Sequence, residues 1–208
     1  MSEIDPLYWM QYKDIEQVVQ LHLRTFSGFF LSFLGKTFLQ VLYVSILDDP
    51  SGIAYIYGDS KVIGFVAGTS HPAGFYRQLI SKRLLHFIFA SINPVIQRPG
   101  IIPRMLRALN SPREVDPGPA CATLMSIAVA PEAQGLGIGK KLVGAFLAEA
   151  VRRGMMEVNL TTDALNNEPV NQFYQRYGFS LARSFTTPEG RLMNEYRIKL
   201  AAQIQERR

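Results

Sequence analysis

Three alternating glycines, Gly135, Gly137 and Gly139, are the residues of this sequence whose spacing most clearly points to chemistry. Glycines lack a Cβ atom, so successive backbone N–H groups can converge on one ligand. An apolar run at 122–129 precedes them, and apolar residues recur at helical spacing over 140–153. The first N–H groups of a helix have no intrahelical partner. The pattern therefore predicts an anion site at a strand–turn–helix junction, with phosphate as its natural ligand.

Two known phosphate-binding motifs do not match this stretch. A P-loop requires glycine at 134 and serine or threonine at 141, where this chain has Gln134 and Lys141. A dinucleotide fingerprint requires a third glycine at 140 or 142, where it has Lys140 and Leu142. Residues 134–139 match the pattern Q-x-x-G-x-G at every specified position. A glycine-rich connection that binds nothing is the structural alternative.

A second motif follows at 167–179, where Asn167, Tyr174, Gly178 and Phe179 form N-x6-Y-x3-G-F. Together the two motifs resemble the GNAT acetyltransferase superfamily, specifically over 123–179, generally over the N-terminal part, and not at all over 71–119. The resemblance implies an α/β fold, with a mixed central sheet of about six to seven strands flanked by helices. It further implies one domain over 1–208, with an acetyl-CoA-binding core at 120–179.

The resemblance also implies roles for particular residues. The backbone at the strand end would pair with the pantetheine arm of coenzyme A, the loop would hold its pyrophosphate, and an asparagine would contact it. These cofactor-binding residues are Ile127, Ala128, Val129, Gln134, Gly135, Leu136, Gly137, Ile138, Gly139, Lys140 and Asn167. No metal is expected. The single cysteine, Cys121, excludes a disulfide within the chain and a cysteine metal cluster.

The implied reaction is direct attack of a primary amine on the thioester of acetyl-CoA. The amine would belong to a small molecule, an amino sugar or a protein. Tyr174 is the predicted general acid, because a phenol near pKa ~10 can protonate a thiolate whose thiol has a pKa near ~8.5. A backbone N–H near Val129 would stabilise the oxyanion. A non-catalytic acyl-CoA-binding module of the same fold is the alternative function.

The sequence leaves the identity of the general base open. A water chain is one possibility, and five side chains are others: His71, Glu114, Asp116, Asp163 and Glu195. Glu195 alternates with Arg197 on a polar strand face, which favours a surface salt bridge instead.

Hydrophobic periodicity predicts the elements that position these residues. We expect strands at 7–12, 53–57, 61–68, 122–129, 156–162, 179–186 and 192–200. Helices are expected at 14–26, capped by Asp14, at 31–47, at 140–153, and from Asn167, a cap candidate, to Gly178. His22 falls on an apolar helix face and is interpreted as a core histidine. Residues 71–119 form a helical insertion between the third and fourth strands. It is a lid over the acceptor site, a homodimer surface, a patch for anionic membrane, or a packed insertion with a solvated basic face.

Charge and composition indicate less about the function than the two motifs do. The formal net charge is +5 and 48% of the residues are hydrophobic, which is typical of a globular protein with an anionic ligand such as coenzyme A. Basic residues are not interleaved with aromatic ones along the sequence, so no nucleic-acid partner is predicted. Without a basic leader segment or an apolar run of ~18 residues, we expect a cytoplasmic protein with no membrane span.

Overall fold

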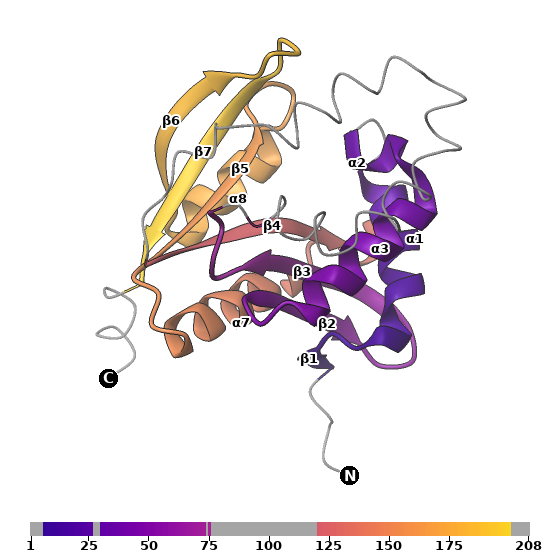
Figure 1. Cartoon of the computed structure of the whole chain (residues 1–208). Helices are drawn as coiled ribbons and strands as arrows, with labels where there is room; N and C mark the ends of the chain where they lie inside the picture. Colours follow the sequence, from indigo (N-terminus) through magenta and orange to yellow (C-terminus); the bar gives the residue numbers. More distant parts are fainter. Residues whose placement is uncertain (1–5, 27–29, 74, 76–119, 201–208) are drawn as a thin grey trace.

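The computed structural model describes residues 6–26, 30–73, 75 and 120–200. Their strands form one seven-stranded sheet in the order β1-β2-β3-β4-β5-β7-β6 (Figure 1). Neighbouring strands are antiparallel except for the parallel pair β4 and β5. The strands are β1 Leu7–Trp9, β2 Gly52–Gly58, β3 Val62–Thr69, β4 Cys121–Val129, β5 Glu157–Asp163, β6 Ser180–Thr186 and β7 Leu192–Lys199. The predicted mixed sheet flanked by helices is confirmed.

Helices cover both faces of the sheet. On one face, the ring of Phe65 in β3 contacts His22 of α1 and Tyr43 of α3. On the other face, a Cβ built at the adjacent Gly64 would meet Leu142 of α7. The helices are α1 Ile15–Thr25, α2 Phe30–Phe33, α3 Gly35–Asp48, α7 Ile138–Arg152 and α8 Glu168–Tyr177, with 3-10 turns η1 Tyr12–Asp14 and η3 Pro131–Ala133.

Helix α8 lies beside α7, and two glycines of α7 allow the close approach. A Cβ built at Gly139 would be 3.5 Å from the ring of Phe173, and one built at Gly144 would be 3.3 Å from the hydroxyl of Tyr177. The glycine loop and the α8 motif, 30 positions apart in the sequence when counted from Gly137 to Asn167, are thereby brought to the same face.

Two predicted details at the N-terminus are wrong. The carboxylate of Asp14 does not cap α1, because it accepts hydrogen bonds from the backbone N–H of Gln11 at 2.8 Å and the hydroxyl of Tyr8 at 3.1 Å. It closes the preceding turn instead, which ends the predicted strand early. The predicted helix over 31–47 is two helices that are separated at Leu34, and Gly35, the first residue of the second helix, adopts a φ of +83°.

His22 is a core residue, as predicted. It is 2% exposed, and its Nδ1 atom lies 2.7 Å from the hydroxyl of Tyr43. Burial lowers the pKa of His22 to about 4, so the ring is neutral near pH 7. Its Nε2 atom has no hydrogen-bond partner among the described residues.

Most of the predicted insertion, including Glu114 and Asp116, lies outside the described residues. Its position in the chain, between β3 and β4, agrees with the prediction. Among the helices that the structure describes, none is long and apolar enough to cross a membrane.

Candidate active site

The sheet splits open between its two parallel strands. Strands β4 and β5 pair only from Cys121↔Glu157 to Thr123↔Asn159. Beyond that point β5 continues along β7 as far as Asp163, whereas β4 continues along β3 as far as Val129. Figure 1 shows the two strands diverging from their common start. We call the region between these unpaired stretches of β4 and β5 the cleft.

A β-bulge explains why the strands separate. Ala67 of β3 pairs with Ser126, but Gly68 pairs with Leu124, which leaves Met125 as an extra residue in β4. An extra residue on one strand bends that strand and increases its twist. The bend comes two residues after the last pair with β5, and it carries the rest of β4 away from its parallel neighbour. No residue type in this stretch marks a bulge.

The cleft exposes backbone groups of β4. The N–H of Ala130 donates to the carbonyl of Ile63 at 2.8 Å, which sets the phase of the antiparallel pairing. Since antiparallel residues alternate between the two sides of a strand, Ala128 also pairs toward β3, while Ile127 and Val129 direct their N–H and C=O groups toward the cleft. Of the three predicted strand residues, these two can offer hydrogen bonds to a ligand there.

The glycine loop follows β4 directly. Gly135 and Gly137 have φ angles of +80° and +76°, which favour glycine, and α7 begins at Ile138, two residues earlier than predicted. The N–H of Lys141 bonds to the carbonyl of Gly137 at 3.1 Å. The three N–H groups before it, from residue 138 to residue 140, therefore have no intrahelical acceptor. They form a site for an anion at the positive end of the helix dipole.

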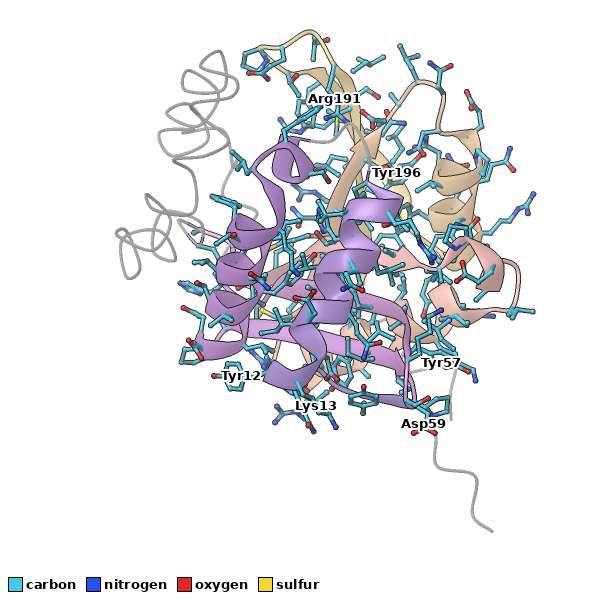
Figure 2. The ribbon with its side chains drawn as sticks, turned by 90° about the vertical axis from the view of Figure 1, so that its right-hand side faces the viewer. Tyr12, Lys13, Tyr57, Asp59, Arg191 and Tyr196 are labelled. Carbon is cyan, nitrogen blue, oxygen red and sulfur yellow. The ribbon has the colours of Figure 1, made fainter. Side chains whose placement is uncertain are left out.

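The side chains of Lys140 and Lys141 have different surroundings. The Nζ atom of Lys141 lies 3.4 Å from the hydroxyl of Tyr57 and 5.1 Å from the centre of its ring. Tyr57 lies at the end of β2, far from Arg191 at the opposite end of the molecule (Figure 2). The charge of Lys141 is thus held at the β2 edge, whereas Lys140 is exposed on the first turn of α7.

Asn167 stands at the start of α8, with Pro169 in the first turn as predicted, but its side chain does not cap the helix. Its Nδ2 atom donates to Oγ1 of Thr162 at 2.7 Å and to the carbonyl of Asp163 at 3.2 Å. An amide nitrogen can only donate, so it binds the end of β5 instead of the helix N–H groups. Its Oδ1 atom accepts no hydrogen bond from the described residues and is available to a ligand.

Asn171 is a site residue that sequence reasoning missed. Its Nδ2 atom donates to the carbonyls of Asp163 and Asn167, both at 2.9 Å. Its Oδ1 atom accepts from Asn194 at 3.0 Å and from the hydroxyl of Tyr196 at 2.9 Å. The signal was its spacing, since a residue four after Asn167 and three before Tyr174 lies on their helix face.

Tyr174 lies in the aromatic core of this part of the chain and is 4% exposed. Its ring centre is 5.6 Å from that of Phe179 and 6.0 Å from that of Tyr196. Burial raises the pKa of Tyr174 above its ordinary value near 10, because the phenolate would lose its hydration. The hydroxyl is therefore protonated throughout the neutral range, as a proton donor must be.

The two candidate carboxylates that the structure describes, Asp163 and Glu195, are paired with arginines. Asp163 accepts from Arg191 at 2.6 and 2.7 Å, and Glu195 accepts from Arg183 at 2.6 Å and Arg197 at 2.8 Å. The salt bridge predicted for Glu195 exists, but it is not a surface one, because that side chain is 4% exposed. Burial alone would raise the pKa of Glu195, but the hydrogen bonds from its two arginines lower it. His71 is exposed just after β3.

The chain is similar to known proteins in sequence and in fold. The sequence model described as the acetyltransferase (GNAT) family matches residues 15–179. The chain belongs to the GNAT acetyltransferase family. Over 71 residues, 32% of this chain, it is 39% identical to a mycothiol acetyltransferase from Arthrobacter sp. (strain FB24). It spans only about a fifth of the length of the curated mycothiol acetyltransferases that it matches, 22% and 19%.

Solved GNAT structures confirm the fold. The ribosomal-protein-S18-alanine N-acetyltransferase from Escherichia coli superposes with a TM-score of 0.56 at 16% identity, over 93% of this chain and 92% of that one. Mutant forms of the spermidine/spermine N-acetyltransferase SpeG from Vibrio cholerae give 0.60 at 14% identity, over 97% of both chains. Such distant likeness supports the fold alone. Among the described residues, no group of three or more His, Cys, Asp and Glu side chains could hold a metal ion.

Proposed function

We propose that this GNAT protein transfers the acetyl group of acetyl-CoA to a primary amine of a small molecule, an amino sugar or a protein. One observation carries the proposal. The unpaired edge of β4 is followed, after the turn η3 and the glycine loop, by the unpaired N–H groups at the start of α7. A ligand with an extended arm and a pyrophosphate at one end matches that sequence of groups.

Each part of the donor would have its own contacts. The pyrophosphate would accept hydrogen bonds from the N–H groups of the loop and first turn, over residues 135–140, with Lys140 nearby. The pantetheine arm would run along β4 and bond to the backbone of Ile127 and Val129, in place of the missing strand partner. Asn167 would contribute its free Oδ1 atom.

In the proposed reaction Tyr174 acts as the general acid. The nitrogen lone pair of a neutral amine attacks the thioester carbonyl, and the oxyanion that forms is stabilised by a backbone N–H of β4. The C–S bond breaks, and the phenol of Tyr174 gives its proton to the departing thiolate. The raised pKa of Tyr174 disfavours its own deprotonation, so its hydroxyl stabilises the thiolate as a hydrogen-bond donor before the proton moves.

The acceptor follows less directly. The relatives and neighbours are named for mycothiol, for a ribosomal protein and for polyamines, so small-molecule and protein acceptors are both represented. The charged groups of β5 and β7, paired as Asp163–Arg191 and Glu195–Arg197, favour a polar acceptor over an apolar one.

Two measurements test the proposal. Calorimetric titration of the purified protein should detect acetyl-CoA binding, and a thiol-release assay with a panel of amines should detect turnover. The panel should contain amino sugars, peptides with free N-termini, lysine peptides and polyamines. Binding without thiol release from any amine would instead support a regulatory module that keeps the acyl-CoA site. The absence of binding would remove the proposal altogether.

A further inference from the structure

A side-chain hydrogen bond marks the inner end of the cleft. The hydroxyl of Thr123, in β4, donates to Oδ1 of Asn159, in β5, at 2.6 Å. These two residues are also the last pair that joins the two strands before they diverge. Both side chains are partly exposed. The pair therefore lies at the vertex of the cleft.

The pair lies on the opposite face of the sheet from Tyr174. The ring of Tyr174 packs on Tyr196, whose partner in β5 is Leu160. Successive side chains of a strand point to opposite faces, so Asn159, next to Leu160, points away from Tyr174. The two groups are thus at the same level along β5, with the sheet between them.

The bulge in β4 puts Thr123 on that same face. A Cβ built at Gly68 would lie 2.8 Å from the ring of Phe146 in α7, so Gly68 and its partner Leu124 face α7. Thr123, the next residue, faces the other side, which α1 and α3 cover over β3. A thioester that reaches the vertex would have Tyr174 on the side of α7 and α8 and the Thr123–Asn159 pair on the opposite side, which would leave that second side to the acceptor.

We propose that Thr123 and Asn159 bind the attacking amine and select amines that have an oxygen atom on the carbon adjacent to the amino-bearing carbon. The Thr123 hydroxyl gives its hydrogen to Asn159, so its lone pairs can accept an N–H of the neutral amine. The Nδ2 atom of Asn159 forms no hydrogen bond to a described residue and can donate to the neighbouring oxygen. Amino sugars, amino alcohols and the N-termini of peptides have such an oxygen, whereas simple alkylamines do not.

The pair positions the amine and takes no proton. The nitrogen forms the new C–N bond as the C–S bond breaks, and its surplus proton leaves to water. The thiolate receives its proton from Tyr174, which recovers one from solvent. This inference rests on the proposed function, because it requires an acetyl-CoA thioester in the cleft.

A matched pair of small amines tests the selectivity on the wild-type protein. Ethanolamine and propylamine have the same number of heavy atoms and differ in the oxygen. With kcat/KM expressed per neutral amine, we expect ethanolamine to be favoured by about tenfold, the worth of one hydrogen bond. Asn159→Leu should abolish that preference. An equal kcat/KM for the two amines in the wild-type protein would overturn the selectivity.

Variants of Thr123 test the amine contact. Thr123→Val keeps the shape and removes the hydroxyl, and it should lower kcat/KM for the amine by about 10- to 100-fold, with acetyl-CoA affinity unchanged within about twofold. Thr123→Ser should retain most of the activity. Thr186→Val, the same change at an exposed position of β6, is the control.

The outcomes separate the two proposals. A wild-type protein that neither binds acetyl-CoA nor releases thiol contradicts the proposed function, and the amine contact with it. An active wild type with an equally active Thr123→Val variant contradicts only the amine contact. Equal losses in amine kcat/KM and acetyl-CoA affinity would show that Thr123 merely holds the strands together.

Discussion

The hydroxyl of Tyr196 donates to Oδ1 of Asn171 at 2.9 Å, while its ring lies 6.0 Å from the ring of Tyr174. One β7 side chain thereby contacts α8 at two successive turns. The same Asn171 amide holds the backbone of Asp163 and Asn167. The two α8 residues proposed to act on coenzyme A, Asn167 and Tyr174, are therefore positioned by one polar cluster.

Tyr196→Phe removes the hydroxyl from this cluster and leaves Asn171 with one acceptor site less satisfied. We expect the free energy of unfolding to fall by about 1–3 kcal/mol, the usual effect of an unsatisfied buried polar group. The acetyl-CoA dissociation constant should rise, because Asn167 loses part of its support. Urea unfolding and calorimetry measure the two effects. Tyr12→Phe, which removes an exposed tyrosine hydroxyl bonded to Asp48 outside this cluster, is the matched control and should leave acetyl-CoA affinity unaltered.

Tyr174→Phe keeps the ring contacts and removes only the hydroxyl, which forms no hydrogen bond to a described residue. Stability and acetyl-CoA affinity should change little, whereas kcat should fall by roughly 10²–10⁴ because the acid acts in the transition state. Since burial raises the pKa of Tyr174, this loss should be similar at every pH from 6 to 10, with the alkaline limb due to Tyr174 above that range. A variant with normal kcat would show that the thiolate is protonated by another group.

Gly137→Ala and Gly139→Ala form a matched pair in the loop. A Cβ at Gly137 would have no atom within 4 Å, so the penalty is the backbone strain of a φ of +76°, about 1–2 kcal/mol. Gly139 lies within α7, and its added Cβ would make an ordinary 3.5 Å contact with Phe173. We expect weakened acetyl-CoA binding in the first variant and near-normal binding in the second. The reverse order in calorimetry would contradict the arrangement proposed for the loop.

His22 should make stability sensitive to acid. Its pKa falls from 6.5 to about 4 on folding, so the unfolded chain binds the proton more tightly. The stabilisation from neutral His22 is then fully present above pH 6.5 and is lost as the pH falls toward 4, by roughly 2–3 kcal/mol at pH 4.5. Urea unfolding at pH 7.5 and pH 4.5 measures this difference. In His22→Gln the pH dependence should shrink by that amount, and an unchanged dependence would assign it to other groups.

The sequence predicted the elements that have strong local patterns. The glycine motif, the apolar stripe of α7 and the turn residues at 58–60 identified the strands and helices around them, because their causes lie within a few residues. The bulge at Met125 could not be predicted, since it depends on how β4 pairs with β3. The burial of Glu195 was missed for a similar reason. Its two arginines come from different strands, and only the folded sheet brings them together.

The parallel pairing of β4 with β5 spans only three residues on each strand. All other strand contacts lie within an N-terminal half, β1 to β4, or a C-terminal half, β5 to β7. The two halves of the sheet are therefore joined only by this short pairing. A ligand bound along β4 in the cleft would act as an additional strand between the two halves. In hydrogen-exchange measurements, the amides of Ile127 and Val129 should exchange quickly in the free protein and slowly with acetyl-CoA. The donor would then serve as a structural tie between the halves before it serves as a reactant.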